Sequence, residues 1–164
     1  MPLIYTASLA TPGTSACSAT PNTETGAISL KPPVTLPANP IYFQAAYVVG
    51  RGGGLTAISG IVFRVIRVTT ASTGGTSTTP NPKDTGFAAA TTTAVTGQTI
   101  SSTGRTNHVI FGCGAAGPGG WVAPNPDSMI VQPAVVTTAP SVDLVAASAT
   151  ASLTYEFSVE FQES

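Results

Sequence analysis

The chain has 164 residues and a formal net charge of −1, and only 8% of its residues are charged, against about 25% in an ordinary soluble domain. Its six Lys and Arg residues are scattered singly, which argues against nucleic acid as a direct partner, because phosphate binding needs clustered basic residues. No stretch reaches the roughly 18 apolar residues of a membrane helix, and the opening MPLIYTAS lacks the pattern of a secretory signal. We therefore expect a soluble protein made in a cytoplasm, with no membrane partner.

Thr, Ser, Ala, Gly and Pro take the place of the missing charges. This mixture suits strands and turns and suits helices poorly, because Gly and Pro break helices and Thr loses rotamer freedom in them. The length fits one domain covering residues 1–164. The composition and the short apolar runs described below therefore predict an all-β fold, a single antiparallel β-sandwich of eight to ten short strands with little helix.

Residues 1–26 begin with Ile4 and Tyr5 and continue as a polar run punctuated by Pro and Gly. This pattern predicts a short edge strand or an extended N-terminal arm followed by a loop. An arm that buries little of its own surface can lie on a neighbouring molecule, which makes Ile4 and Tyr5 candidate interface residues; a frayed terminus is the alternative. Four prolines then confine residues 27–40 to a sheet edge or a connection.

Residues 41–49 predict a strand with every second residue, from Ile41 to Val49, on one face. After a glycine turn, residues 58–68 carry apolar side chains on both faces and predict a central strand. Arg64 and Arg67 lie on its opposite faces. They could pair with Glu156 or Glu160 across the sheet, or reach solvent with their stems packed.

Residues 69–85 form a low-complexity run of Thr, Ser, Gly and Pro, for which we predict a long loop. Residues 87–95 permit a short helix or a strand, and the Thr triplet favours the strand. Further short strands are predicted at residues 107–111, 129–132 and 142–146, with a glycine-rich loop between the first two.

The last stretch has the clearest pattern in the chain. Apolar and polar residues alternate strictly along residues 153–162, which predicts a half-buried strand. Its core face is expected to carry Tyr155, Phe157, Val159 and Phe161. Glu156 and Glu160 share the opposite face about 13 Å apart, farther than the paired carboxylates of a glycosidase. Their expected role is to keep a hydrophobic strand from unwanted pairing.

No catalytic, cofactor or metal site is predicted, and we do not expect an enzyme. Residues 112–117 match the dinucleotide-binding glycine pattern, but Pro and Gly follow at once and no helix can open there. His108 is the only histidine, and Cys17 and Cys113 would complete at most three metal ligands. A nucleophilic pair of Cys113 and His108 lacks an orienting group. The two cysteines are expected as buried free thiols, and a single disulfide is the alternative.

Trp121 lies in the stretch GGWVAPNPDS at residues 119–128. Its side chain can either fill space in the core or act as an anchor at an interface. Together with the final LTYEFSVEFQE and the opening MPLIYTAS, this stretch resembles small Thr/Ala/Gly-rich structural proteins of tailed bacteriophages. These include capsid decoration or cement proteins, which bind the outer shell, often as trimers with jelly-roll or similar β-sandwich folds.

This resemblance implies a homo-oligomeric virion protein on the capsid surface, a trimer that contacts the major capsid protein. It assigns no functional residue. Two alternatives remain: a phage tail or fibre component, and a carbohydrate- or receptor-binding β-sandwich that uses the loops at residues 69–85 and 112–128.

Overall fold

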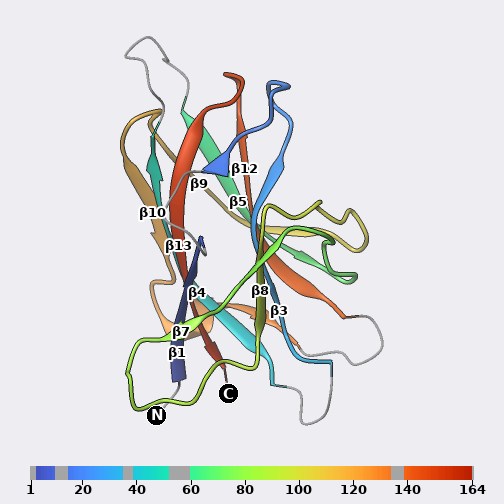
Figure 1. Ribbon diagram of the computed structural model, residues 1–164, viewed down its shortest axis with the longest axis vertical. Helices are drawn as coiled ribbons and strands as arrows, with labels where there is room; N and C mark the ends of the chain where they lie inside the picture. The colour runs from blue at the N-terminus through green and yellow to red at the C-terminus, as the bar shows by residue number, and fades with distance from the viewer. Residues whose placement is uncertain (1–2, 10–14, 35–38, 52–59, 134–138, 164) are drawn as a thin grey trace.

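The computed structural model describes residues 3–9, 15–34, 39–51, 60–133 and 139–163. Two antiparallel sheets pack face to face as a β-sandwich (Figure 1). The described residues contain a single 3-10 turn, η1 (Pro126–Ser128), and no α-helix. The predicted all-β sandwich is therefore confirmed.

The sheets draw their strands from both halves of the chain. The seven-stranded sheet contains, in spatial order, β10 (Pro118–Val122), β4 (Ile41–Gly50), β13 (Thr154–Glu163), β1 (Leu3–Ser8) and β7 (Asn81–Pro82), with β11 (Ile130–Gln132) paired to β4 and β2 (Ser15–Ala16) paired to β13. The six-stranded sheet contains β6 (Thr76–Thr78), β8 (Thr93–Thr96), β3 (Thr25–Lys31), β12 (Ser141–Ser148), β5 (Ile61–Val68) and β9 (Thr106–Cys113).

The strand order is that of a jelly roll. In chain order the principal strands are β1, β3, β4, β5, β9, β10, β12 and β13. One sheet contains the first, eighth, third and sixth of these strands as neighbours, that is β1, β13, β4 and β10. The other sheet contains the second, seventh, fourth and fifth, that is β3, β12, β5 and β9. This arrangement gives the two Greek keys of the jelly-roll class. The described residues contain thirteen strands, of which nine, including β8, are longer than three residues. The eight to ten strands predicted from the sequence correspond in number to these longer ones.

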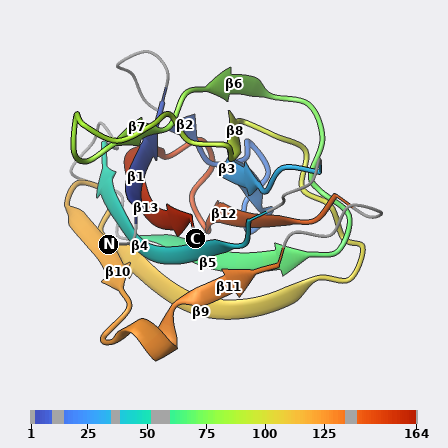
Figure 2. The ribbon, with the colours of Figure 1, turned by 90° about the horizontal axis from the view of Figure 1, so that it is seen from below.

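The connection from β5 to β9 is more ordered than the predicted loop at residues 69–85. It contributes β6 and β8 to the edge of one sheet beside β3, and β7 to the edge of the other beside β1 (Figure 2). Pro82 cannot donate a backbone hydrogen bond, but it is tolerated because β7 is an edge strand, which has a neighbouring strand on one side only. The strand predicted over residues 87–95 is observed only at Thr93–Thr96.

The core lies between the sheets and is centred on β13. Tyr155, Phe157, Val159 and Phe161 are buried, and the polar residues between them are partly exposed. Tyr155 meets Phe63 of the opposite sheet edge to face, with ring centroids 5.1 Å apart. The period-2 pattern of the sequence thus corresponds to one buried and one outer face.

A β-bulge in β4 reverses part of the face predicted for residues 41–49. Phe161 lies opposite Phe43, whereas Glu160 lies opposite Ala45, so Gln44 is an extra residue. Beyond this bulge the alternation shifts by one, which turns Val48 inward and leaves Tyr47 44% exposed. The prediction of a single face from Ile41 to Val49 is wrong for this reason.

The glycine-rich stretch after β9 carries the chain from one sheet to the other. A Cβ atom added to Gly119 would lie 2.3 Å from the carbonyl oxygen of Gly112 and 2.7 Å from Cβ of Cys113. Only glycine permits this close approach of two backbones. This close approach explains Gly119, which follows the pattern at residues 112–117, whereas a Cβ atom added to Gly114 or Gly117 would meet no atom within 4 Å.

We predict that Phe157→Asp prevents folding, because it places an unpaired charge in the core beside Tyr155. Glu156→Gln is the matched control, since the ion pair of Glu156 with Arg51 is solvent-exposed and contributes about 1 kcal/mol or less. Circular dichroism and gel filtration measure both variants. A soluble, folded Phe157→Asp protein would show that the faces of β13 are assigned incorrectly.

Candidate functional site

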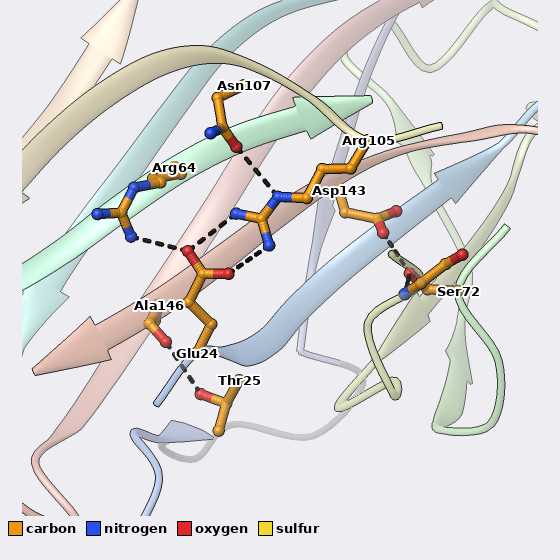
Figure 3. A network of polar contacts seen from close by, with 9 residues as sticks. Glu24, Thr25, Arg64, Ser72, Arg105, Asn107, Asp143 and Ala146 are labelled. Carbon is orange, nitrogen blue, oxygen red and sulfur yellow. Dashed lines mark hydrogen bonds and ion pairs between the residues drawn. The ribbon is translucent and has the colours of Figure 1, made fainter. Parts of the chain in front are cut away.

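A charged network occupies the outer face of the six-stranded sheet (Figure 3). The carboxylate of Glu24, just before β3, accepts hydrogen bonds from both terminal nitrogens of Arg105 and one of 2.7 Å from Arg64. Nε of Arg105 also donates to Asn107. The hydrogen bonds from Arg105 hold the pKa of Glu24 below its usual value, against the opposing effect of burial. The network orders the segment that leads into β3.

This network excludes one of the two alternatives that the sequence left open for Arg64, an ion pair with Glu156 or Glu160 across the sheet. Arg64 cannot reach Glu156 or Glu160, because those residues lie on the outer face of the other sheet. Glu156 pairs with Arg51 and Glu160 pairs with Lys83, both at 2.7 Å. Each glutamate is therefore paired with a basic residue beside its own sheet.

A second polar cluster surrounds Asp143, which is fully buried on β12. Ser72 donates its hydroxyl hydrogen to this carboxylate and accepts the backbone N–H of Ser101. Burial raises the pKa of Asp143, and the nearby hydroxyls of Ser29, Ser72 and Ser141 offset only part of the effect. The cluster fastens the chain after β5 onto the sheet (Figure 3).

A pocket of about 590 Å³ opens beside Glu24. It is lined by β2, by the start of β3 and by residues 97–100. Gln98 is 4% exposed, and neither its side-chain oxygen nor its nitrogen has a hydrogen-bond partner. The volume lies within the range of small-molecule sites, although the pocket includes neither loop in which recognition was predicted.

The side chains considered for nucleophilic or metal chemistry do not converge. Cys17 and Cys113 are buried and free, and burial raises the pKa of Cys17 to about 11, which disfavours the reactive thiolate. His108 is exposed on the edge strand β9. Within the ranges that the structure describes, no three or more His, Cys, Asp or Glu side chains are grouped to hold a metal ion.

The candidate interface residues are more enclosed than expected. Tyr5 is buried and stacks on Phe161 with ring centroids 5.6 Å apart, because β1 pairs along β13 instead of extending as a free arm. Ile4 is half-buried. Trp121 is also half-buried and stacks on Phe43, so its ring packs mainly on the core.

Other large apolar side chains are exposed instead. Tyr47, Val122 and Val131 lie on the outer face of the seven-stranded sheet, and Val62 and Ile110 lie on that of the six-stranded sheet. The alternation in the sequence did not predict that Tyr47 is exposed, because the bulge at Gln44 shifts the alternation before it reaches Tyr47. Such a bulge is revealed only by the cross-strand partners, which are distant in the sequence.

Comparisons of the chain with protein-family models, curated proteins and solved structures gave no match. The fold itself defines the class, a jelly-roll β-sandwich. None of the helical structure in the described ranges is long and apolar enough to span a membrane. Because a fold does not determine a function, we infer the function of this chain from its surfaces and pockets.

We predict that Asp143→Asn alters the pH dependence of stability. Because its pKa is raised, Asp143 binds its proton more tightly in the folded state than in the unfolded state. As the pH rises from about 4, the ordinary pKa of an aspartate, through the higher pKa of the folded state, this group therefore lowers the free energy of unfolding. The variant should lack that decline, and its new amide can donate to the unpartnered hydroxyl oxygens of Ser29 or Ser141.

Urea unfolding of both proteins at acidic and neutral pH measures this difference. Asp143→Asn should be at least as stable as the parent chain at neutral pH. A loss there of more than about 1 kcal/mol, the net contribution of one hydrogen bond, would contradict this account of the buried carboxyl.

Proposed function

We propose that the chain is a non-enzymatic structural protein of a virion, of the capsid decoration or cement type. In this role it stabilises a phage head by contacts with the shell and with further copies of itself. The observation that carries the proposal is an apolar strip on the outer face of the seven-stranded sheet, formed by Tyr47, Val122 and Val131. The phage resemblance of the sequence suggests the setting.

The three residues of the apolar strip share one face along β4 and its two edge partners. Gly120 lies opposite Tyr47 and Val122 opposite Ala45, which makes Tyr47 and Val122 diagonal neighbours. Val131 lies opposite Tyr42 farther along β4. Their exposed fractions are 44%, 51% and 36% for Tyr47, Val122 and Val131.

The surroundings of the strip suit a protein interface. Ser158 lies opposite Tyr47 on β13, and the charged residues of this sheet neutralise one another in the pairs Arg51–Glu156 and Lys83–Glu160. Interface centres are typically poor in unpaired charge and rich in tyrosine. Contacts that bury roughly 800 Å² on each partner would link neighbouring shell subunits, and a trimer is the assembly that we propose.

Substituting the strip tests this proposal. Val122→Lys should weaken self-association and binding to expanded phage heads, because it introduces a charge that must be desolvated at the contact. Val62→Lys is the matched control: it is the same substitution at an exposed valine of the other sheet. Sedimentation velocity measures assembly, and co-sedimentation with heads measures binding.

The proposal expects the parent chain to form oligomers and bind heads, and the Val62→Lys protein to retain both properties. A strictly monomeric parent chain that binds no heads would contradict the proposed function. Equal losses in the two variants would contradict the assignment of the contact to the apolar strip.

A second candidate function is recognition of a carbohydrate or receptor by a tail or fibre component. The pocket beside Glu24 favours it, since Ser15, Thr25 and Thr99 contribute hydroxyl-bearing residues and Gln98 contributes an unpartnered carboxamide. This function predicts selective glycan binding that Gln98→Ala weakens. A glycan array without signal for the parent chain would eliminate the carbohydrate form of this candidate.

A further inference from the structure

Arg67 differs from the other arginines of the chain in its surroundings. It follows Ile61, Phe63 and Val65 at two-residue intervals on β5 and therefore lies on the inner face, at the end of the sandwich. Arg51, Arg64 and Arg105 each form an ion pair. All seven acidic side chains belong to the described part of the chain, and none of them pairs with Arg67.

One donor of this guanidinium also lacks a partner. Nε of Arg67 is shielded from solvent and has no acceptor among the residues that the structure describes. A buried N–H without an acceptor is uncommon in native proteins and often marks the position of an ion or water. Arg67 thus has the charge and the free donor of a residue arranged for an anionic ligand.

Arg67 lines a cavity of about 150 Å³ at this end of the molecule. The cavity is large enough to hold more than one water, and residues from both sheets line it. The other lining residues are Val68, Thr69, Gly104, Thr106, Gln132, Pro133 and Pro140. No carboxylate belongs to this lining, so the guanidinium charge is uncompensated.

Gln132 supplies a second unpartnered group to the same cavity. This residue of β11 is 3% exposed, and its side-chain nitrogen donates to the carbonyl oxygen of Pro133 at 3.0 Å. Its side-chain oxygen is buried and has no donor. A ligand that satisfies both residues must accept hydrogen bonds from Arg67 and donate one to Gln132.

We propose that this cavity, the Arg67 pocket, binds one hydroxylated oxyanion of the hydrogen phosphate type. Two ligand oxygens accept from the planar guanidinium fork, and the ligand hydroxyl donates to Oε1 of Gln132. The site is separate from the apolar strip and does not depend on the proposed virion function.

Because Gln132 requires a hydrogen-bond donor, we expect the Arg67 pocket to distinguish between oxyanions. Sulfate resembles phosphate in size and shape but carries no proton at neutral pH, so it leaves the buried oxygen of Gln132 without a partner. An unpaired buried polar group costs about 1–3 kcal/mol. The Arg67 pocket should therefore bind inorganic phosphate about tenfold or more tightly than sulfate.

Calorimetric titrations with inorganic phosphate and with sulfate, at constant ionic strength set by chloride, test this inference. The parent chain should bind one phosphate, and Arg67→Met should abolish binding. Gln132→Leu should weaken phosphate binding about tenfold and remove the preference over sulfate. Arg51→Met is the matched control and should bind like the parent chain.

A purely structural role of Arg67 predicts a different result. Since Nε has no partner, the Arg67→Met protein should be no less stable than the parent chain in phosphate-free buffer. If Arg67 had a purely structural role, the substitution would lower the stability. Should that variant fail to fold, the phosphate-to-sulfate ratio of Gln132→Leu decides the question. Absence of saturable phosphate binding by the parent chain, an unchanged ratio in Gln132→Leu or an equal loss in Arg51→Met would overturn the proposal.

Discussion

The contact between Tyr155 and Phe63 joins the two sheets, and the rest of the sandwich is arranged around it. β13 lies in the interior of its sheet and pairs with β4 on one side and β1 on the other. Because side chains alternate along a strand, burying the aromatic face of β13 fixes its register with both neighbours. That register places β1 in the sheet and makes Tyr5 a core residue.

The same constraint determines which residues are exposed. The bulge at Gln44 keeps both Phe43 and Val48 in the core, and the shift it introduces turns Tyr47 outward. On the outer faces, most charged side chains neutralise one another in ion pairs. Among the features that remain without an internal explanation are the apolar strip on one sheet and the unpaired guanidinium of Arg67 at the end of the sandwich.

The sequence predicted those features that depend on local alternation. The strict pattern from Tyr155 to Phe161 identified a half-buried strand, and the abundance of Thr, Gly and Pro indicated an all-β fold. The position of Tyr47 could not be predicted, because a bulge appears only when β4 is aligned with β13, more than a hundred residues later. The partner of Arg64 was missed for a similar reason, since Glu24 belongs to a segment whose position depends on the jelly-roll crossover.

The candidate pockets were not predictable either. Each is lined by segments from distant parts of the chain, and its distinguishing feature is a buried polar group without a partner, Gln98 in one and Arg67 with Gln132 in the other. Single-sequence patterns report which residues are apolar, but hydrogen-bond satisfaction depends on the complete set of tertiary neighbours. The glycine-rich stretch after β9 shows the converse case, because Gly119 is explained by a close approach of two backbones that the residue pattern does not reveal.

The most direct test of the proposed shell contact is a cryo-electron microscopy reconstruction of phage particles incubated with the purified chain. The account predicts density for the jelly roll on the outside of the head, with Tyr47, Val122 and Val131 covered by a neighbouring subunit. Density located in the tail, or a head-bound jelly roll whose apolar strip faces solvent, would contradict it.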